Sequence, residues 1–190
     1  MLRAMDHPPL DGDELVLAMP ARELFAATGF VPTPSMPVLE SLGEETWFAL
    51  PTVIREDPLA REVRLGLVVV RETPTGREVL AQADGTILTL ITVTPDLLPH
   101  AGLAPLKRLA QESARIRCGL TAACGVTLAG LINDPLLPGL GSIVVPIYRT
   151  VAPPGTEAPA GATWIGTGAL ARLPLAPACA LVARSLVQRP

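Results

Sequence analysis

The stretch LAPLKRLAQESARIRCGLTAACGV, residues 103–126, decides the fold because it predicts one long helix and the turn that follows it. Its apolar residues recur at steps of three and four positions: Leu103, Leu106, Leu109, Ala110, Ile116 and Leu120. Charged side chains lie between them, so we expect an amphipathic helix over residues 103–123, with Gly125 placed to end it. The last nine residues, CGLTAACGV (118–126), carry no charge and no aromatic ring.

Strand patterns flank this helix on both sides. Residues 61–72, REVRLGLVVVRE, start charged and continue as a β-branched run; TPTG (73–76) is a turn signal, and REVLAQA (77–83) is the expected hairpin partner. After the helix, VTLAGLIND (126–134) and GSIVVPIYRTVA (141–152) are typical of two further strands. Several strands, one long helix, further strands and a last helix predict a mixed α/β layout, with helices covering a mostly antiparallel or mixed sheet.

The size and composition of the chain fit a single domain. Its 190 residues can bury a sizeable core, and 49% apolar against 17% charged residues require a charge-poor surface. We expect residues 1–13 to form a polar, proline-containing arm and residues 14–190 to form the domain. Within it, residues 31–45 and 153–162 are expected to be loops, and the tail from Thr167 to hold one or two helical pieces.

Charge and hydropathy argue against several classes of function. The formal net charge is -3 and no run of Lys or Arg stands out, which disfavours nucleic-acid binding. The mean hydropathy is +0.42, but charges or prolines interrupt every run that approaches the ~20 apolar residues of a membrane span. The N-terminal segment has acidic residues and prolines where a secretory signal would be apolar. We therefore expect a soluble, cytoplasmic protein that binds neither nucleic acid nor membranes.

The three cysteines do not indicate a disulfide framework or a metal site. Cys118 and Cys124 are six residues apart, which does not place them on one face of a helix, and Cys179 is distant in the sequence. Only His7 and His100 are available as further ligands for zinc. We therefore expect buried, apolar thiols rather than a structural zinc site.

The end of residues 103–126 resembles the signature of the Nudix hydrolases. That box runs over 23 residues from a loop into a helix as G-x5-E-x7-R-E-U-x-E-E-x-G-U, where U is a bulky aliphatic residue. Aligned by its end, the box occupies residues 104–126 of this chain. Leu120 then falls on the first U, Gly125 on the final glycine and Val126 on the last U.

Segments on both sides of the box extend the resemblance. LAGLIND (128–134) and GSIVVPIY (141–148) resemble the segment GfINdd…VGxvHlGlvy of a bacterial branch of the family described as predicted phosphoesterases. Residues 16–30 and 54–72 look like the leading portion of that branch, so the resemblance covers roughly residues 14–152. It implies a Nudix-like α/β/α sandwich with a mixed β-sheet in a single domain.

The box of this chain departs from the family at the positions that carry the chemistry. Its arginine position holds Cys118, and its three helix-glutamate positions hold Gly119, Ala122 and Ala123. In the family, those carboxylates hold Mg²⁺ on a di- or polyphosphate, and Mg²⁺ requires oxygen ligands. Positions i, i+3 and i+4 share one helix face, so we expect that face to be smooth, uncharged and unable to bind a metal.

The sequence does not decide the structure of this vacated site. A loop or strand could collapse into it, or it could remain an apolar, metal-free cleft. The candidate lining residues and displaced donors are Trp47, His100, Glu112, Asn133, Asp134 and Tyr148, with Asp96 and Glu157 as further loop donors. The structural alternatives are a solvated helix residue for Glu112 and a turn former for Asp134. A nucleophilic Cys118 is a further alternative, with only Arg115 and Arg117 as basic groups within helical reach.

These observations favour a Nudix-fold protein that has lost metal-dependent hydrolysis and serves as a binding or assembly module. The charge-poor composition favours apolar contacts between copies, so a homodimer is the expected assembly, and a small-molecule ligand stays unidentified. No cofactor is expected. Two alternatives remain: a hydrolase of nucleoside diphosphate derivatives that uses displaced carboxylates and Mg²⁺, and an unrelated α/β structural domain.

Overall fold

A long central strand organises the fold of this protein, which we describe from a computed structural model covering residues 14–24, 28–119, 125–170 and 172–187. The elements follow in the order β1 (Val16–Pro20), η1 (Arg22–Leu24), β2 (Gly29–Val31), α1 (Met36–Glu44), β3 (Trp47–Ala49), α2 (Pro51–Glu56), β4 (Ala60–Thr73), β5 (Gly76–Gln82), β6 (Thr89–Thr92), α3 (Leu103–Cys118), β7 (Val126–Asn133), β8 (Ile143–Ala152), β9 (Ala162–Gly166), α4 (Thr167–Leu170) and α5 (Pro177–Val187). The strands of the described residues form one nine-stranded sheet around β4.

The two edges of β4 are used differently. Along one edge, β8 runs parallel to β4 over almost its whole length. Along the other edge, three strands pair antiparallel in turn: β1 at residues 60–62, β6 at 64–67 and β5 at 70–73. Further out, β7 pairs with β8, β2 with β7, β3 with β1, and β9 with β5, all antiparallel. The sheet is therefore mixed, as the sequence predicts.

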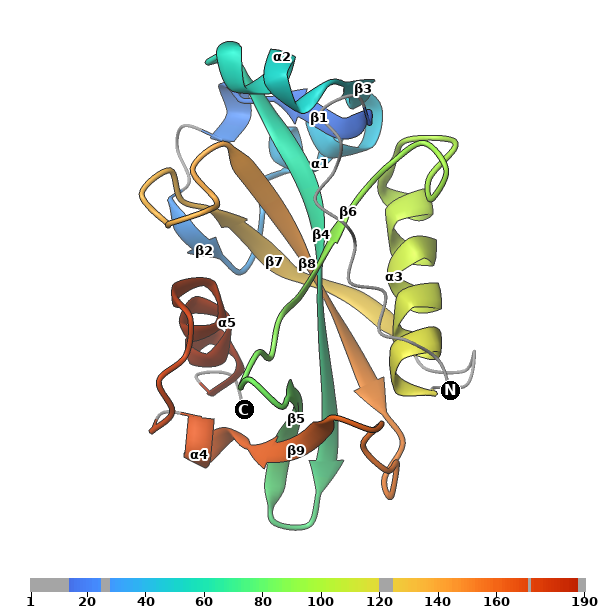
Figure 1. The fold of residues 1–190 in the computed structure, drawn as a ribbon, viewed down its shortest axis with the longest axis vertical. Helices are drawn as coiled ribbons and strands as arrows, with labels where there is room; N and C mark the ends of the chain where they lie inside the picture. The colour runs from blue at the N-terminus through green and yellow to red at the C-terminus, as the bar shows by residue number, and fades with distance from the viewer. Residues whose placement is uncertain (1–13, 25–27, 120–124, 171, 188–190) are drawn as a thin grey trace.

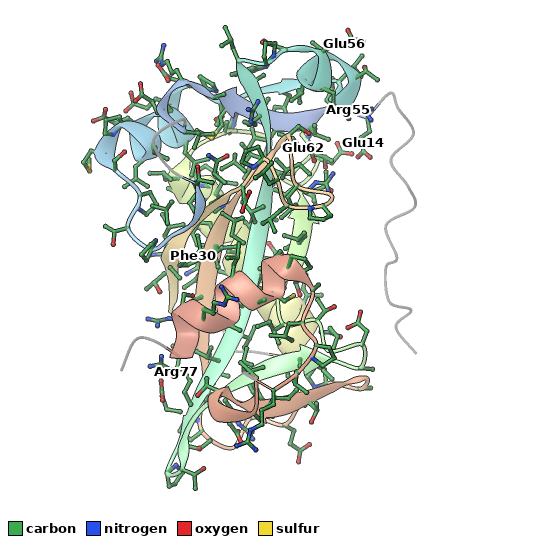
Figure 2. The ribbon with its side chains drawn as sticks, turned by 90° about the vertical axis from the view of Figure 1, so that its left-hand side faces the viewer. Glu14, Phe30, Arg55, Glu56, Glu62 and Arg77 are labelled. Atoms are coloured by element: carbon green, nitrogen blue, oxygen red, sulfur yellow. The ribbon has the colours of Figure 1, made fainter. Side chains whose placement is uncertain are left out.

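Helices cover both faces of the sheet, and this explains the continuous apolar run in β4. Leu65 and Val69 pack in one core cluster with Leu106 of α3, and Val68 packs in a second cluster with Val182 of α5. Figure 1 shows α3 and α5 on opposite sides of the strands, and Figure 2 looks onto α5 in front of the sheet, near Phe30 of β2. We call the two faces the α3 face and the α5 face. The architecture is the expected α/β/α sandwich.

Proline placement explains where the expected loop at residues 31–45 is wrong. This segment contains helix α1, with Ser35 at the N-cap and Pro37 in its first turn. Proline is compatible with the first turn of a helix because its missing N–H is not needed there. Val38 and Leu42 of α1 are buried, so the helix is held by core contacts that its proline-rich sequence does not reveal.

The other expected helices and strands are present, and their first or last residues differ from the predicted bounds. The hairpin of β4 and β5, the strands β7 and β8, and helical pieces in the tail are confirmed. The loop expected over residues 153–162 ends one residue earlier, because Ala162 begins β9 and pairs with Gln82. The predicted arm, residues 1–13, lies outside the described residues. Within the described chain, no helix combines the length and apolar character needed to cross a membrane.

Candidate functional site

Helix α3 presents an apolar side to the sheet and a charged side to solvent, as its spacing predicts. Leu106, Ala110 and Ala114 are at most 2% exposed and pack against β4, β7 and β8. Ile116 was expected on the same apolar side, but it is 69% exposed. The pattern is therefore wrong in the last turn of the helix, where one apolar residue points away from the core.

The helix ends earlier than the sequence predicts. Its last residue is Cys118, and Gly119 adopts the left-handed conformation, with φ 59° and ψ 24°. A glycine in this conformation is the commonest way to end an α-helix, because other residues carry a Cβ that crowds the backbone there. Gly119, rather than Gly125, therefore ends α3 and does not belong to a helix face. Ala122 and Ala123 lie outside the described residues.

This end point changes how the box pattern maps onto the chain. The box pattern ends in a glycine and an aliphatic residue. Aligned on Gly119, the residue that ends α3, instead of on Gly125, the pattern moves six residues toward the N-terminus. The three glutamate positions then fall on Ser113, Ile116 and Arg117, and the first aliphatic position falls on Ala114, which is buried. In both alignments, none of the three positions holds a carboxylate.

Substitution of Gly119 distinguishes these two placements by the sign of its effect. With Gly119 in the left-handed conformation, Gly119→Ala should lower the free energy of unfolding by about 1 kcal/mol, because alanine is strained there. Inside a continuing helix, the same change would raise the free energy of unfolding by about 0.5–1 kcal/mol. Urea denaturation of the two proteins measures the difference, and a stabilised variant would contradict the helix end described above.

The displaced carboxylates considered from the sequence are dispersed. Glu112 is on the exposed side of α3, where its Oε1 lies 3.4 Å from Nη2 of Arg115. Asp134 accepts the backbone N–H of Leu136 through Oδ1 at 2.9 Å, which is the turn-forming role. Asp96 and Glu157 are exposed loop residues. In the described ranges, no three His, Cys, Asp or Glu residues are grouped so that they could hold a metal ion.

The predicted lining residues occupy buried and exposed positions of different elements. Asn133, at the end of β7, is buried and donates its Nδ2 hydrogen to the carbonyl of Leu24 at 2.9 Å, which ties β7 to η1. Tyr148 is 2% exposed on β8, and burial raises the pKa of its phenol to about 12, so it stays neutral at physiological pH. Trp47 begins β3 and is half-exposed, and His100 is exposed before α3.

A hollow of about 250 Å³ lies between η1 and α1, and none of those residues lines it. The described residues that line it are Arg22, Glu23, Pro37, Glu40, Ser41, Glu44 and Glu45. The hydroxyl of Ser41 donates to Oε2 of Glu45 at 2.6 Å, and the guanidinium of Arg22 pairs with the other oxygen. The hydrogen bond from Ser41 and then the pairing with Arg22 hold the pKa of Glu45 below its usual value. The i, i+4 spacing of Glu40 and Glu44 would have indicated one charged helix face, but the segment was expected to be a loop.

A row of buried and partly buried residues crosses the α3 face. Val126, Thr150 and Val69 pair in register on β7, β8 and β4, and Leu80 of β5 pairs with Trp164 of β9. We call these five residues the α3-face row. Thr150 is fully buried, and its hydroxyl has no hydrogen-bond partner among the described residues. Sequence reasoning missed this row, because only the strand registers bring residues so distant in the chain together.

Known proteins resemble this chain in structure rather than in sequence. The crystal structure of Tm1382, provisionally assigned as a Nudix hydrolase, superposes with a TM-score of 0.67 over 92% of this chain and 98% of that one, at 14% identity. A Nudix hydrolase from M. Smegmatis, RenU, gives a TM-score of 0.41 at 19% identity, over 84% of this chain and 94% of that one. No family model matches the sequence. The search of curated proteins also found no match. The likeness to Tm1382 shows a Nudix-like fold.

Proposed function

We propose that this Nudix-fold protein does not perform metal-dependent phosphoanhydride hydrolysis and acts as a binding or assembly module. The observation that carries the proposal is the composition of the helix end: the three glutamate positions hold Gly119, Ala122 and Ala123 in one alignment, and Ser113, Ile116 and Arg117 in the other. Mg²⁺ binds through hard oxygen ligands, chiefly carboxylates, and supplies both the Lewis acid and the activated water for this reaction. Neither set of residues provides them.

Glu112, the acidic residue nearest these positions on α3, does not replace the three missing glutamates. Glu112 is the acidic residue of α3; its side chain is 65% exposed and faces Arg115, which also competes for the carboxylate. A single carboxylate in water binds Mg²⁺ weakly, because the ion keeps its hydration shell unless several ligands converge. The alternative, a hydrolase with displaced carboxylates, requires that Glu112 or the loop acids act together on one ion.

A hydrolysis assay tests the loss of activity. We expect no phosphate release above the background rate from nucleoside diphosphate derivatives, with Mg²⁺ or with Mn²⁺, over a range of pH. Turnover well above background would contradict the proposal. In that case Glu112→Gln identifies the alternative: a loss of turnover in this variant, with folding unchanged, would place a displaced carboxylate in the reaction.

We further propose that the partner in assembly is a second copy of this chain. The support is compositional: 17% charged residues leave a charge-poor surface, and apolar side chains such as Met36, Val53, Leu59 and Leu136 are more than half exposed. Light scattering at increasing protein concentration should give a mass near twice the 19.9 kDa of the chain. A mass that stays at one chain would contradict self-association without bearing on the loss of hydrolysis.

A further inference from the structure

Residues 153–161, PPGTEAPAG, join β8 to β9 without forming a helix or strand, and we call them the strap. Their two ends are fixed by the sheet: Ala152 is buried at the end of β8, and Ala162 pairs with Gln82 of β5. Between these ends most of the strap is exposed. Figure 1 shows it at the lower end of the sheet, between the orange strands β8 and β9.

One carbonyl oxygen of the strap is held by two side chains of the sheet. The carbonyl of Thr156 accepts hydrogen bonds from Nη1 of Arg71 at 2.7 Å and from the indole Nε1 of Trp164 at 2.9 Å. The guanidinium carbon of Arg71 lies 4.5 Å from the centre of the Trp164 ring, within the range of a cation–π contact. Nε of Arg71 also donates to Oε2 of Glu78 at 2.6 Å. We call these four groups the latch.

The strap packs against the core cluster of the α3 face and is bonded to one member of the α3-face row, Trp164. Ala158 packs against the core cluster that contains Val69 and Leu80. Trp164, which holds the strap, is opposite Leu80 in the register of β5 and β9 and packs against the same cluster. The latch therefore holds the strap on the α3 face of the sheet, beside Trp164.

Few contacts besides the latch hold the middle of the strap. The N–H and hydroxyl of Thr156 both donate to the carbonyl of Pro153, which is internal to the strap. Among the described residues, the only hydrogen bonds that join residues 154–160 to another element are the two made by the Thr156 carbonyl and the one from Ala162 to Pro159 at the β9 end. The strap residue that packs against the core cluster is Ala158, whose side chain is small. Segments with so little buried apolar surface open at a lower free energy than the whole protein.

We propose that the strap is a latched cover on the α3-face row, and that release of the Arg71 latch opens it locally while the sheet stays folded. Arg71 is the residue that makes this possible, because its guanidinium touches the carbonyl of Thr156, the indole ring of Trp164 and the carboxylate of Glu78 at once. Opening would remove Thr156 from Trp164 and expose the indole to solvent. This device stands independently of the proposed loss of hydrolysis.

The hydrogen on Nε1 of Trp164 provides a direct measurement, because it is bonded to the strap. We expect Arg71→Gln to speed the exchange of this hydrogen with solvent by about tenfold or more, because the open state becomes more populated. NMR measures the exchange rate. The amides that pair β4 with β8 should change less than twofold, because the sheet does not open. Glu78→Gln, which keeps the guanidinium but removes its support, should give a smaller change in the same direction.

A second arginine on the same hairpin is the matched control. Arg77 pairs with Glu72 at 2.8 Å across β4 and β5, whereas the carbonyl of Thr156 is bonded to Arg71 and Trp164, so Arg77→Gln should leave indole exchange unchanged. The proposal is overturned when Arg71→Gln leaves the indole exchange rate unchanged. It is also overturned when indole and sheet amides speed up together, which would mean that Arg71 stabilises the whole protein rather than the strap.

Discussion

Gly130→Ala will lower the free energy of unfolding by roughly 3 kcal/mol, because the space for a side chain at this position is already occupied. A Cβ at residue 130 would lie 2.6 Å from Cζ of Phe30 and 2.7 Å from the carbonyl oxygen of Val31. The oxygen cannot move away freely, because Val31 pairs with Leu131 in the ladder between β2 and β7. The backbone of Gly130 has φ 157°, beside the register shift in β7, and alanine is strained there.

Gly125→Ala is the matched control for this prediction. Gly125 precedes the same strand and has open space around its Cβ position, so its substitution should change the free energy of unfolding by less than about 0.5 kcal/mol. Urea denaturation with linear extrapolation measures both variants. Equal stabilities for the two variants would show that β2 does not pack against β7 at Gly130 as described.

Leu106→Ala will lower the free energy of unfolding by about 3 kcal/mol, because it leaves a cavity between α3 and the sheet. Leu106 is fully buried in the core cluster that joins α3 to β4, β7 and β8. Helix α3 also contacts α1 near its start, where Leu103 approaches Gly43. The loss of Leu106 should therefore loosen the whole α3 face and appear as a lower midpoint in urea and a lower melting temperature.

Ile116→Ala tests the same helix at a position that the sequence pattern places on the same apolar side as Leu106. Ile116 is 69% exposed, so its truncation should change the free energy of unfolding by less than about 0.5 kcal/mol. The contrast between the two variants measures which side of α3 faces the sheet. A large loss in Ile116→Ala would mean that the last turn of the helix is buried, and that the sequence pattern was right where the structure differs from it.

The candidate site marks the limit of what the pattern of residues can predict. The absence of carboxylates from the three glutamate positions of the box could be read directly from the sequence, and it holds in both alignments. The position of the helix end could not be read there, because Gly119 and Gly125 are both suitable helix-ending residues. The conformation of Gly119 decides between them, and it also removes that residue from the helix face on which it was expected.

The sequence by itself determined the class of fold, the central hairpin, the apolar side of α3 and the lack of a carboxylate set at its end. These features depend on local periodicity and on residue identity, which neighbouring positions reveal without knowledge of the distant chain. Only the tertiary structure decided that a proline-rich segment forms α1 and that Val126, Thr150 and Val69 share one row. It also decided that Arg71 reaches the carbonyl of Thr156, 85 positions along the chain. Such contacts depend on strand register and packing, and many different pairings are compatible with the same local pattern.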